Sequence, residues 1–180
     1  MKEITKKAIM DSFMKLCVSN PIHQITVEAI VLDCGISKQT FYNHFKDKYD
    51  LMNYVYKIDM DYANSNFIKK DGDIKKAIEY ILERCLEHEK YYSMIAKYET
   101  QNSFAQFFFQ STKEIYTSYV TEKHGTVLTD SIKHEIEFTS AGAMQLFLGW
   151  IKSGMNEDPS KMASEMFNCI PLTLKELIAF

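Results

Sequence analysis

The sequence has few of the residues that interrupt helices. Only 6 glycines and 3 prolines occur among its 180 residues. Apolar residues recur three and four positions apart through nearly all of the chain, which is the spacing of one face of an α-helix. The shares of hydrophobic residues, 46%, and charged residues, 25%, are ordinary for a globular protein and do not suggest disorder. We therefore expect an all-α fold.

The sequence also lacks a long apolar run. A helix that crosses a membrane needs about 20 consecutive apolar residues, and the chain has no run near that length. Residues 1–13 alternate charged and apolar side chains instead of forming the apolar core of a signal peptide. We expect a cytoplasmic protein without a membrane as partner.

Arrangements typical of enzymes and metalloproteins are missing as well. There is no Gly-rich phosphate loop, H-E-x-x-H or G-x-S-x-G. Residues 87–89 (EHE) fall on an expected helix, where neighbours in sequence point in different directions and are poorly placed to share a metal. The cysteines show no C-x-x-C pair or nearby histidine cluster: Cys17, Cys34, Cys85 and Cys169. We expect no catalytic residues, no metal site and no cofactor.

Near the amino terminus, the sequence predicts two helices. Residues 2–19 place apolar side chains at helical intervals, with most lysines off that stripe, which indicates an amphipathic helix. Asn20-Pro21 ends it. Thr26 then stands at the N-cap of a short helix that ends near Cys34, where its hydroxyl can accept a hydrogen bond from a backbone N–H.

A tight turn and a third short helix follow. Gly35 allows the turn, and Ser37 is a good cap for a helix from Lys38 to Phe45. This is the geometry of a helix-turn-helix, whose second helix enters the major groove of DNA, although glycine turns are also common in proteins that never touch DNA. The side chains favour DNA, because Phe41 and Phe45 would anchor the helix while nearly every outward group can hydrogen-bond to nucleic acid.

The stretch from Ile25 to Leu51 resembles the amino-terminal domain of regulators of the TetR/AcrR type. In that family the pattern begins with a threonine cap, a short helix that contains alanine, a glycine turn and a serine. The run threonine-aromatic-tyrosine-x-histidine-phenylalanine follows, and then a lysine. Asn43 and Tyr49 depart from the usual residues, which bears on operator choice and not on fold. The matching positions are Thr26, Ala29, Gly35, Ile36, Ser37, Thr40, Phe41, Tyr42, His44, Phe45, Lys48 and Leu51.

The resemblance covers about the first third of the chain and implies a bacterial DNA-binding regulator. Phosphate contacts set affinity and register, and we expect them from Thr26, Ser37, Tyr42, His44 and Lys48. The first turn of the recognition helix reaches base edges, so sequence readout is expected from Lys38, Gln39 and Thr40, with Asn43 as a further candidate. Three of the phosphate candidates have a plainer alternative: Tyr42 could shield the core, His44 could meet a backbone carbonyl, and Lys48 could lie on solvated surface.

Helices are expected through the other two thirds of the chain. A long helix from 47 to about 69 would connect the head to the body and end at residues 71–73 (DGD), and Pro171 would interrupt the last helical region after a cap at Asp158. We expect a helix-turn-helix domain at residues 1–48 and a regulatory and dimerisation domain at 70–180. The remaining expected helices are 74–86, 91–98, 103–123 and 129–153.

The apolar helices near the carboxyl end predict a homodimer. Gly142 and Gly149 lie seven apart on one face of the helix at 129–153 and would let another helix approach closely. Similar proteins form a four-helix bundle with a symmetry mate, and a two-fold dimer presents two recognition helices to a pseudo-palindrome in double-stranded DNA. The same patterns would also fit an internal core.

Family members commonly bind a small-molecule effector in the body domain, and the effector alters the placement of the two heads. Residues 149–163 (GWIKSGMNEDPSKMA) also loosely resemble regulators of dihydroxyacetone kinase operons, some of which are activators with a kinase subunit as partner. Repression that a small molecule relieves is the usual mode of action in the family. One alternative is activation controlled by a protein partner, and another is a helical scaffold that does not bind DNA. Methionine and aromatic side chains fill a hydrophobic core more often than they line a ligand pocket. We nevertheless expect an effector pocket lined by Met94, Tyr98, Phe104, Phe108, Tyr116, Met144, Phe147 and Trp150.

Overall fold

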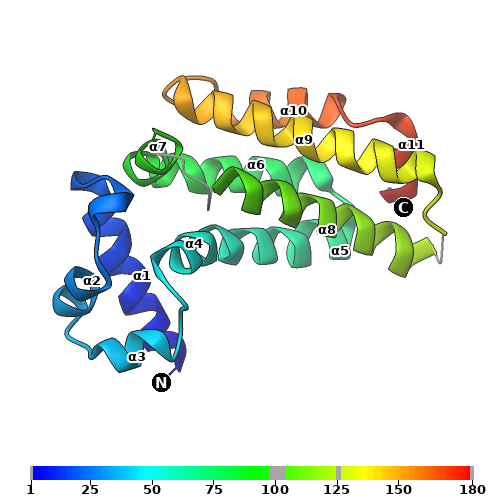
Figure 1. Cartoon of the computed structure of the whole chain (residues 1–180). Helices are drawn as coiled ribbons and strands as arrows, with labels where there is room; N and C mark the ends of the chain where they lie inside the picture. Colours follow the sequence, from blue (N-terminus) through cyan, green and yellow to red (C-terminus); the bar gives the residue numbers. More distant parts are fainter. Residues whose placement is uncertain (1, 98–103, 125–126, 179–180) are drawn as a thin grey trace.

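The structure is a computed structural model of the chain, and it describes residues 2–97, 104–124 and 127–178, apart from the side chains of 122–124 and 178. Every regular element within these ranges is helical, as the sequence predicts. Three helices form a head at one end of a longer bundle, whose helices run roughly side by side (Figure 1). None of the described helices is long and apolar enough to cross a membrane.

The head consists of α1 (Lys2–Ser19), the 3₁₀ turn η1 (Ile22–Gln24), α2 (Val27–Cys34) and α3 (Lys38–Tyr42). Apolar side chains from all three α-helices are fully buried where the helices meet, among them Phe13, Ile30 and Phe41. The Ser12 hydroxyl donates to the carbonyl oxygen of Ile30 at 3.1 Å, which ties α1 to α2.

One helical rod connects the head to the body. It comprises α4 (Lys48–Ala63), the π-helical turn η2 (Asn64–Ile68) and the short α5 (Lys69–Asp71). The long connecting helix expected from the sequence is thus present, but its last part is wound as a π turn. Gly72, with φ of 67°, ends the rod in the left-handed conformation, where glycine carries no steric cost.

The body is built from α6 (Ile74–Glu87), α7 (Glu89–Lys97), α8 (Phe104–His124), α9 (Asp130–Lys152), α10 (Pro159–Asn168) and α11 (Leu172–Ile178). α10 packs on α6, and α9 packs on α8 and α7. The Asp158 carboxylate caps α10 by accepting from the Lys161 N–H, and Pro159 is its first residue. These helices confirm the predicted ones to within a few residues at each end.

The head and the body share one hydrophobic core. A single cluster of buried side chains runs from Ile9 and Phe13 of α1 to Trp150 of α9. The rings of Phe13 and Tyr91 meet edge to face with their centroids 6.1 Å apart, and the Tyr91 hydroxyl contacts the carbonyl oxygen of Met52 at 3.4 Å. α1 therefore packs directly on α7 of the body.

Candidate DNA-binding surface and body cavity

The turn between α2 and α3 is built from local hydrogen bonds that the sequence predicts. The Thr26 hydroxyl accepts from the Ala29 N–H at 3.1 Å and caps α2. Gly35 has φ of 69° and ends α2 in the left-handed conformation. The Ser37 hydroxyl accepts from the Thr40 N–H at 3.0 Å and caps α3. These caps satisfy backbone N–H groups that have no partner inside a helix.

α3 is shorter than expected. It ends at Tyr42, three residues before the predicted end at Phe45. The reason lies in the next helix, because Asp47 is the N-cap of α4 and accepts at 2.8 Å from the N–H groups of Tyr49 and Asp50. A cap needs extended backbone, so the chain must leave α3 before it. Phe45 is nevertheless buried, as expected for an anchor of α3.

The outward side chains of α3 are exposed and engaged with one another. Lys38 and Gln39 are exposed and Thr40 is half-buried. The Lys38 ammonium lies 3.2 Å from the Glu28 carboxylate, and the Gln39 amide donates to the Asn43 side-chain oxygen at 3.2 Å. Each contact is solvent-accessible and can be exchanged for a contact to a base edge. Glu28, which the sequence did not single out, therefore restrains a candidate base-contacting residue.

Among the phosphate candidates, Tyr42 is 54% exposed. Its ring packs edge-on against Phe41, with the centroids 5.4 Å apart, which leaves the hydroxyl outside the core. His44 is half-buried in the turn after α3. Thr26 and Ser37 each use an oxygen lone pair to cap a helix, and the Thr26 hydroxyl keeps its hydrogen for a further acceptor such as a phosphate oxygen. The Ser37 hydroxyl also hydrogen-bonds with the Thr40 hydroxyl, with the two oxygens 2.9 Å apart.

Lys48, at the start of α4, has partners inside the protein. Its ammonium group donates to the carbonyl oxygens of His23 at 3.0 Å and Ile25 at 2.7 Å. Burial lowers the pKa of Lys48, and the nearby Cys17 and Asp47 oppose that shift. Two of its three N–H donors are used, so one is left for a phosphate oxygen.

The body contains a cavity of about 390 Å³ between α4, α6, α8, α9 and α10. Apolar and aromatic side chains make up most of its lining, including Tyr56 and Met60 of α4 and Ile81 of α6. This volume lies within the range of small-molecule sites in proteins, which are mostly apolar. Of the pocket residues expected from the sequence, the lining includes Phe108, Tyr116 and Phe147.

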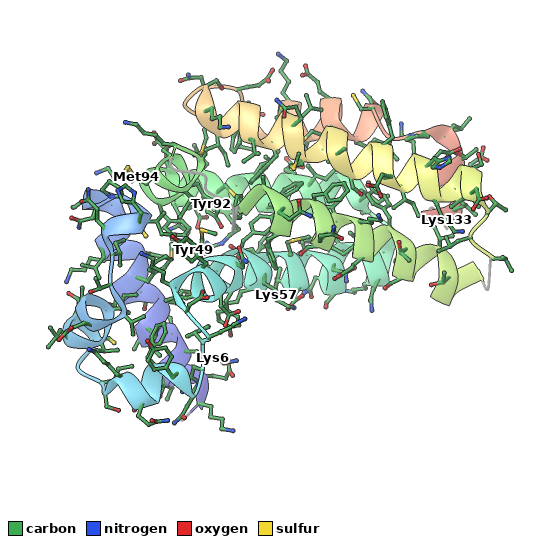
Figure 2. All side chains as sticks on the ribbon, viewed as in Figure 1. Lys6, Tyr49, Lys57, Tyr92, Met94 and Lys133 are labelled. Atoms are coloured by element: carbon green, nitrogen blue, oxygen red, sulfur yellow. The ribbon has the colours of Figure 1, made fainter. Side chains whose placement is uncertain are left out.

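The other expected pocket residues lie elsewhere. Phe104 is buried in the aromatic cluster with its ring centroid 5.1 Å from that of Tyr56. Trp150 is buried, and its indole N–H donates to the Glu157 carbonyl oxygen at 2.9 Å. Met144 packs against the core, and Met94 lies on α7 near the head (Figure 2). Tyr98 falls outside the described residues.

Comparison with known proteins identifies the family. The model of the family described as bacterial regulatory proteins of the tetR family matches residues 9–55, which span most of the head and the start of α4. A second model, described as the C-terminal region of transcriptional regulators, matches residues 72–171, more than half of the chain. The chain belongs to the TetR family. Transcriptional regulators of this family are DNA-binding proteins and not enzymes, and the two matches together span its head and its body.

Individual relatives of this TetR-family chain include an activator. The chain is 28% identical over 99 residues to the HTH-type dhaKLM operon transcriptional activator DhaS of Lactococcus lactis, a match that covers 53% of each protein. It is 27% identical over 186 residues to the uncharacterized HTH-type transcriptional regulator YuxN of Bacillus subtilis, covering 94% of the chain and 62% of that protein. These matches span between half and two thirds of the lengths of the two relatives.

Solved structures share the fold. The dihydroxyacetone kinase operon activator DhaS superposes with a TM-score of 0.69 at 22% identity, over 98% of this chain and 99% of that one. The fatty acid degradation regulator FadR of Bacillus halodurans gives a TM-score of 0.59 at 12% identity, over 92% and 94% of the two chains. At these identities the likeness describes the fold alone.

Proposed function

We propose that this protein regulates transcription by binding a pseudo-palindromic operator as a homodimer, with α3 of each copy in the major groove. The observation that carries this proposal is the surface of α3. Phe41 is fully buried beneath it, while Lys38, Gln39, Tyr42 and Asn43 lie together on the outside. A short helix held by one face and polar on the other is what a recognition helix requires.

The proposed contacts follow from these positions. Base edges would be met by Lys38, Gln39, Thr40 and Asn43. Phosphates would be met from α3 and from the two helix starts that flank it, with contacts from Thr26, Ser37, Tyr42, His44 and Lys48. Such a division makes affinity depend on salt through the phosphate contacts and sequence preference depend on the base contacts.

The dimer is proposed to form through α9. Phe138 is 77% exposed and Leu146 is 40% exposed on this helix. A side-chain carbon built at Gly142 or Gly149 would meet nothing within 4 Å in the chain. This unpartnered apolar face, with two residues that permit close approach, supports packing against α9 of a second copy. Two copies related by a two-fold axis would place their recognition helices on successive turns of DNA.

The body, proposed as residues 70–180, would control the head, proposed as residues 1–48, through the connecting rod. We propose the body cavity as the effector site and the cytoplasm, where the chromosome lies, as the place of action. Repression relieved by a small molecule is the first candidate. Activation is the second, because the relative from L. lactis is named as an activator; a protein partner would then replace or accompany the small molecule.

The deciding experiment is selection of binding sites by the full-length protein from a pool of random double-stranded DNA, followed by footprinting. We expect an enriched sequence with two half-sites whose centres lie about 10 base pairs, or a multiple of that, apart. Binding should weaken steeply as salt is raised. If no sequence is enriched, the operator proposal fails, and a helical scaffold becomes the better description.

A further inference from the structure

Glu28 and Lys38 meet at the surface of the head, although ten residues separate them in the sequence. Glu28 lies in the first turn of α2, and Lys38 is the first residue of α3. The turn at Gly35 brings these two helix starts together, so that Nζ of Lys38 donates to Oε2 of Glu28 at 3.2 Å. The side chains of Lys38 and Glu28 remain 56% and 64% exposed. The start of the recognition helix therefore presents a hydrogen-bond donor and an acceptor side by side.

This contact leaves both groups with unused capacity. An ammonium group has three N–H donors, and a carboxylate has two acceptor oxygens. Within the described residues, the structure gives Lys38 and Glu28 no other hydrogen bond or ion pair. Two donors of Lys38 and Oε1 of Glu28 thus remain for an outside partner. An ion pair this exposed contributes little to stability, so stability does not account for it.

A carboxylate at a DNA-binding surface calls for an explanation, because DNA is itself negatively charged. Residues in the first turn of a recognition helix reach base edges in the major groove, and the contact with Lys38 brings the Glu28 carboxylate to the same edge. Phosphates repel a carboxylate, which lowers affinity for every sequence alike. Its favourable partners among the bases are amino groups, N4 of cytosine or N6 of adenine. Glu28 therefore contributes selectivity and not affinity.

The order of donor and acceptor in this ion pair matches one base pair. In the major groove guanine presents two acceptors, O6 and N7, and cytosine presents the N4 amino donor. O6 and N4 are joined by a Watson–Crick hydrogen bond and so lie about 2.9 Å apart, close to the 3.2 Å between Nζ of Lys38 and Oε2 of Glu28. The ammonium group can therefore donate to O6 and N7 while the carboxylate accepts from N4.

We propose that Glu28 and Lys38 recognise one G·C base pair as a unit, with Lys38 on guanine and Glu28 on cytosine. A T·A pair ranks second, because O4 of thymine and N6 of adenine keep the same order but thymine has a methyl group and no second acceptor. C·G and A·T pairs rank last, since they place an amino group against Lys38 and a carbonyl oxygen against Glu28. This inference rests on the proposed function and adds a base pair to the proposed operator.

The test exchanges the two charges. The double variant Glu28→Lys, Lys38→Glu keeps an ion pair and the net charge but reverses the order of donor and acceptor. The full-length parent and variant each select binding sites from random double-stranded DNA. We expect the parent to enrich G·C at one position of each half-site and the variant to enrich C·G there, with the other positions unchanged. Each protein should prefer its own sequence at least about tenfold, since one good base contact discriminates by a factor of about 5 to 150.

Lys57 and Asp61 supply a matched control. Their side chains form an ion pair at 2.6 Å and are 53% and 64% exposed, much like those of Lys38 and Glu28. Lys57 lies on the connecting rod, away from the recognition helix (Figure 2). The double variant Lys57→Asp, Asp61→Lys should therefore enrich the same sequence as the parent protein.

Glu28→Met measures the carboxylate by itself. Methionine has a similar length but no acceptor for N4, and loss of the negative charge weakens repulsion from phosphates. Affinity for unrelated DNA should therefore rise, while the preference for G·C over C·G should fall at least about fivefold. N4-methylcytosine removes the free amino hydrogen from the DNA instead. It should weaken binding by the parent protein and leave binding by Glu28→Met unchanged.

The outcomes separate this inference from the function on which it rests. It is overturned if the parent and the charge-exchanged variant enrich the same base pair, or if Glu28→Met keeps the full preference for G·C, as it would if Glu28 served only the fold of α2. If the exchanged variant binds no DNA, Glu28→Met and N4-methylcytosine decide the question by themselves. A parent protein that enriches no sequence overturns the proposed function and this inference together.

Discussion

The ammonium nitrogen of Lys48 lies 2.7 Å from the carbonyl oxygen of Ile25, 23 residues earlier in the chain. This bond, with the one to His23, fastens the first turn of the connecting rod to the segment that precedes α2. A residue expected to bind phosphate thus also holds the head in place. Its two roles can be separated experimentally.

Lys48→Met should lower the free energy of unfolding by about 1–3 kcal/mol, because two carbonyls lose a charged donor. Operator affinity should fall as well. Urea unfolding followed by circular dichroism measures the first effect, and fluorescence anisotropy with labelled DNA over a range of salt measures the second. Lys46→Met, at an exposed neighbouring position, should leave the urea midpoint unchanged. An unchanged midpoint in Lys48→Met together with a shallower salt dependence would mean that Lys48 serves phosphate alone.

Gln39→Ala and Tyr42→Phe should have different effects on DNA binding. Gln39 is proposed to meet a base edge, so its loss should relax preference at one base pair by about 1–3 kcal/mol. Tyr42 is proposed to meet a phosphate, so loss of its hydroxyl should weaken binding equally on all sequences. Binding to the selected operator and to each single-base variant distinguishes the two patterns. Identical profiles for both variants would contradict the assignment.

Glu28→Gln should strengthen DNA binding severalfold at low salt. The change releases the Lys38 ammonium from a carboxylate 3.2 Å away and removes a negative charge near the DNA. Stability should change by less than about 1 kcal/mol, since the pair is exposed. Glu165→Gln removes the same charge from a lysine pair on α10 and serves as the control. If both variants raise affinity equally, only net charge matters and Lys38 has no special part.

Asp59 links α4 to α6 and should make stability depend on pH. Burial raises the pKa of its carboxyl above the usual value, while Arg84, whose Nε lies 3.2 Å away, opposes the shift. The folded protein therefore holds this proton more tightly than the unfolded chain does. The free energy of unfolding should therefore fall as pH rises from the ordinary pKa of aspartate through the higher pKa of Asp59 in the folded protein.

Asp59→Asn should remove this dependence. In urea unfolding between pH 4 and 7, the stability of the parent protein relative to the variant should decrease as pH increases. A relative increase would show that the attraction of Arg84 outweighs the cost of burying the carboxylate.

Phe138→Glu should disrupt the proposed dimer. The change removes a large exposed apolar side chain from α9 and places two like charges near the two-fold axis. Sedimentation equilibrium should show a dimer for the parent protein at micromolar concentration. The dissociation constant of the dimer should be at least about tenfold higher for the variant. Leu32→Glu changes an equally exposed side chain on α2, 75% against 77%, and should remain dimeric. A monomeric parent protein would rule the interface out.

Local chemistry made the head predictable from the sequence. Thr26, Gly35 and Ser37 each act within three or four residues of their own position, through a cap or a left-handed turn, so their spacing alone defined the two helices. Phe41 and Phe45 were expected in the core because they lie four apart on one side of α3. The helices of the body were predicted for the same reason, from apolar periodicity and from caps such as Asp158.

Tertiary structure decided what the side chains do once the helices are packed. Lys48 meets carbonyls more than 20 residues away, and no local pattern indicates such partners. The pocket was expected wherever aromatics were dense, yet Phe104 and Trp150 fill the core, while Asn64 and Thr139 line the cavity. Whether a side chain fills space or borders it depends on how several helices pack. A recognition helix is encoded by its own residues, but a cavity is defined only by the packing of helices distant in sequence.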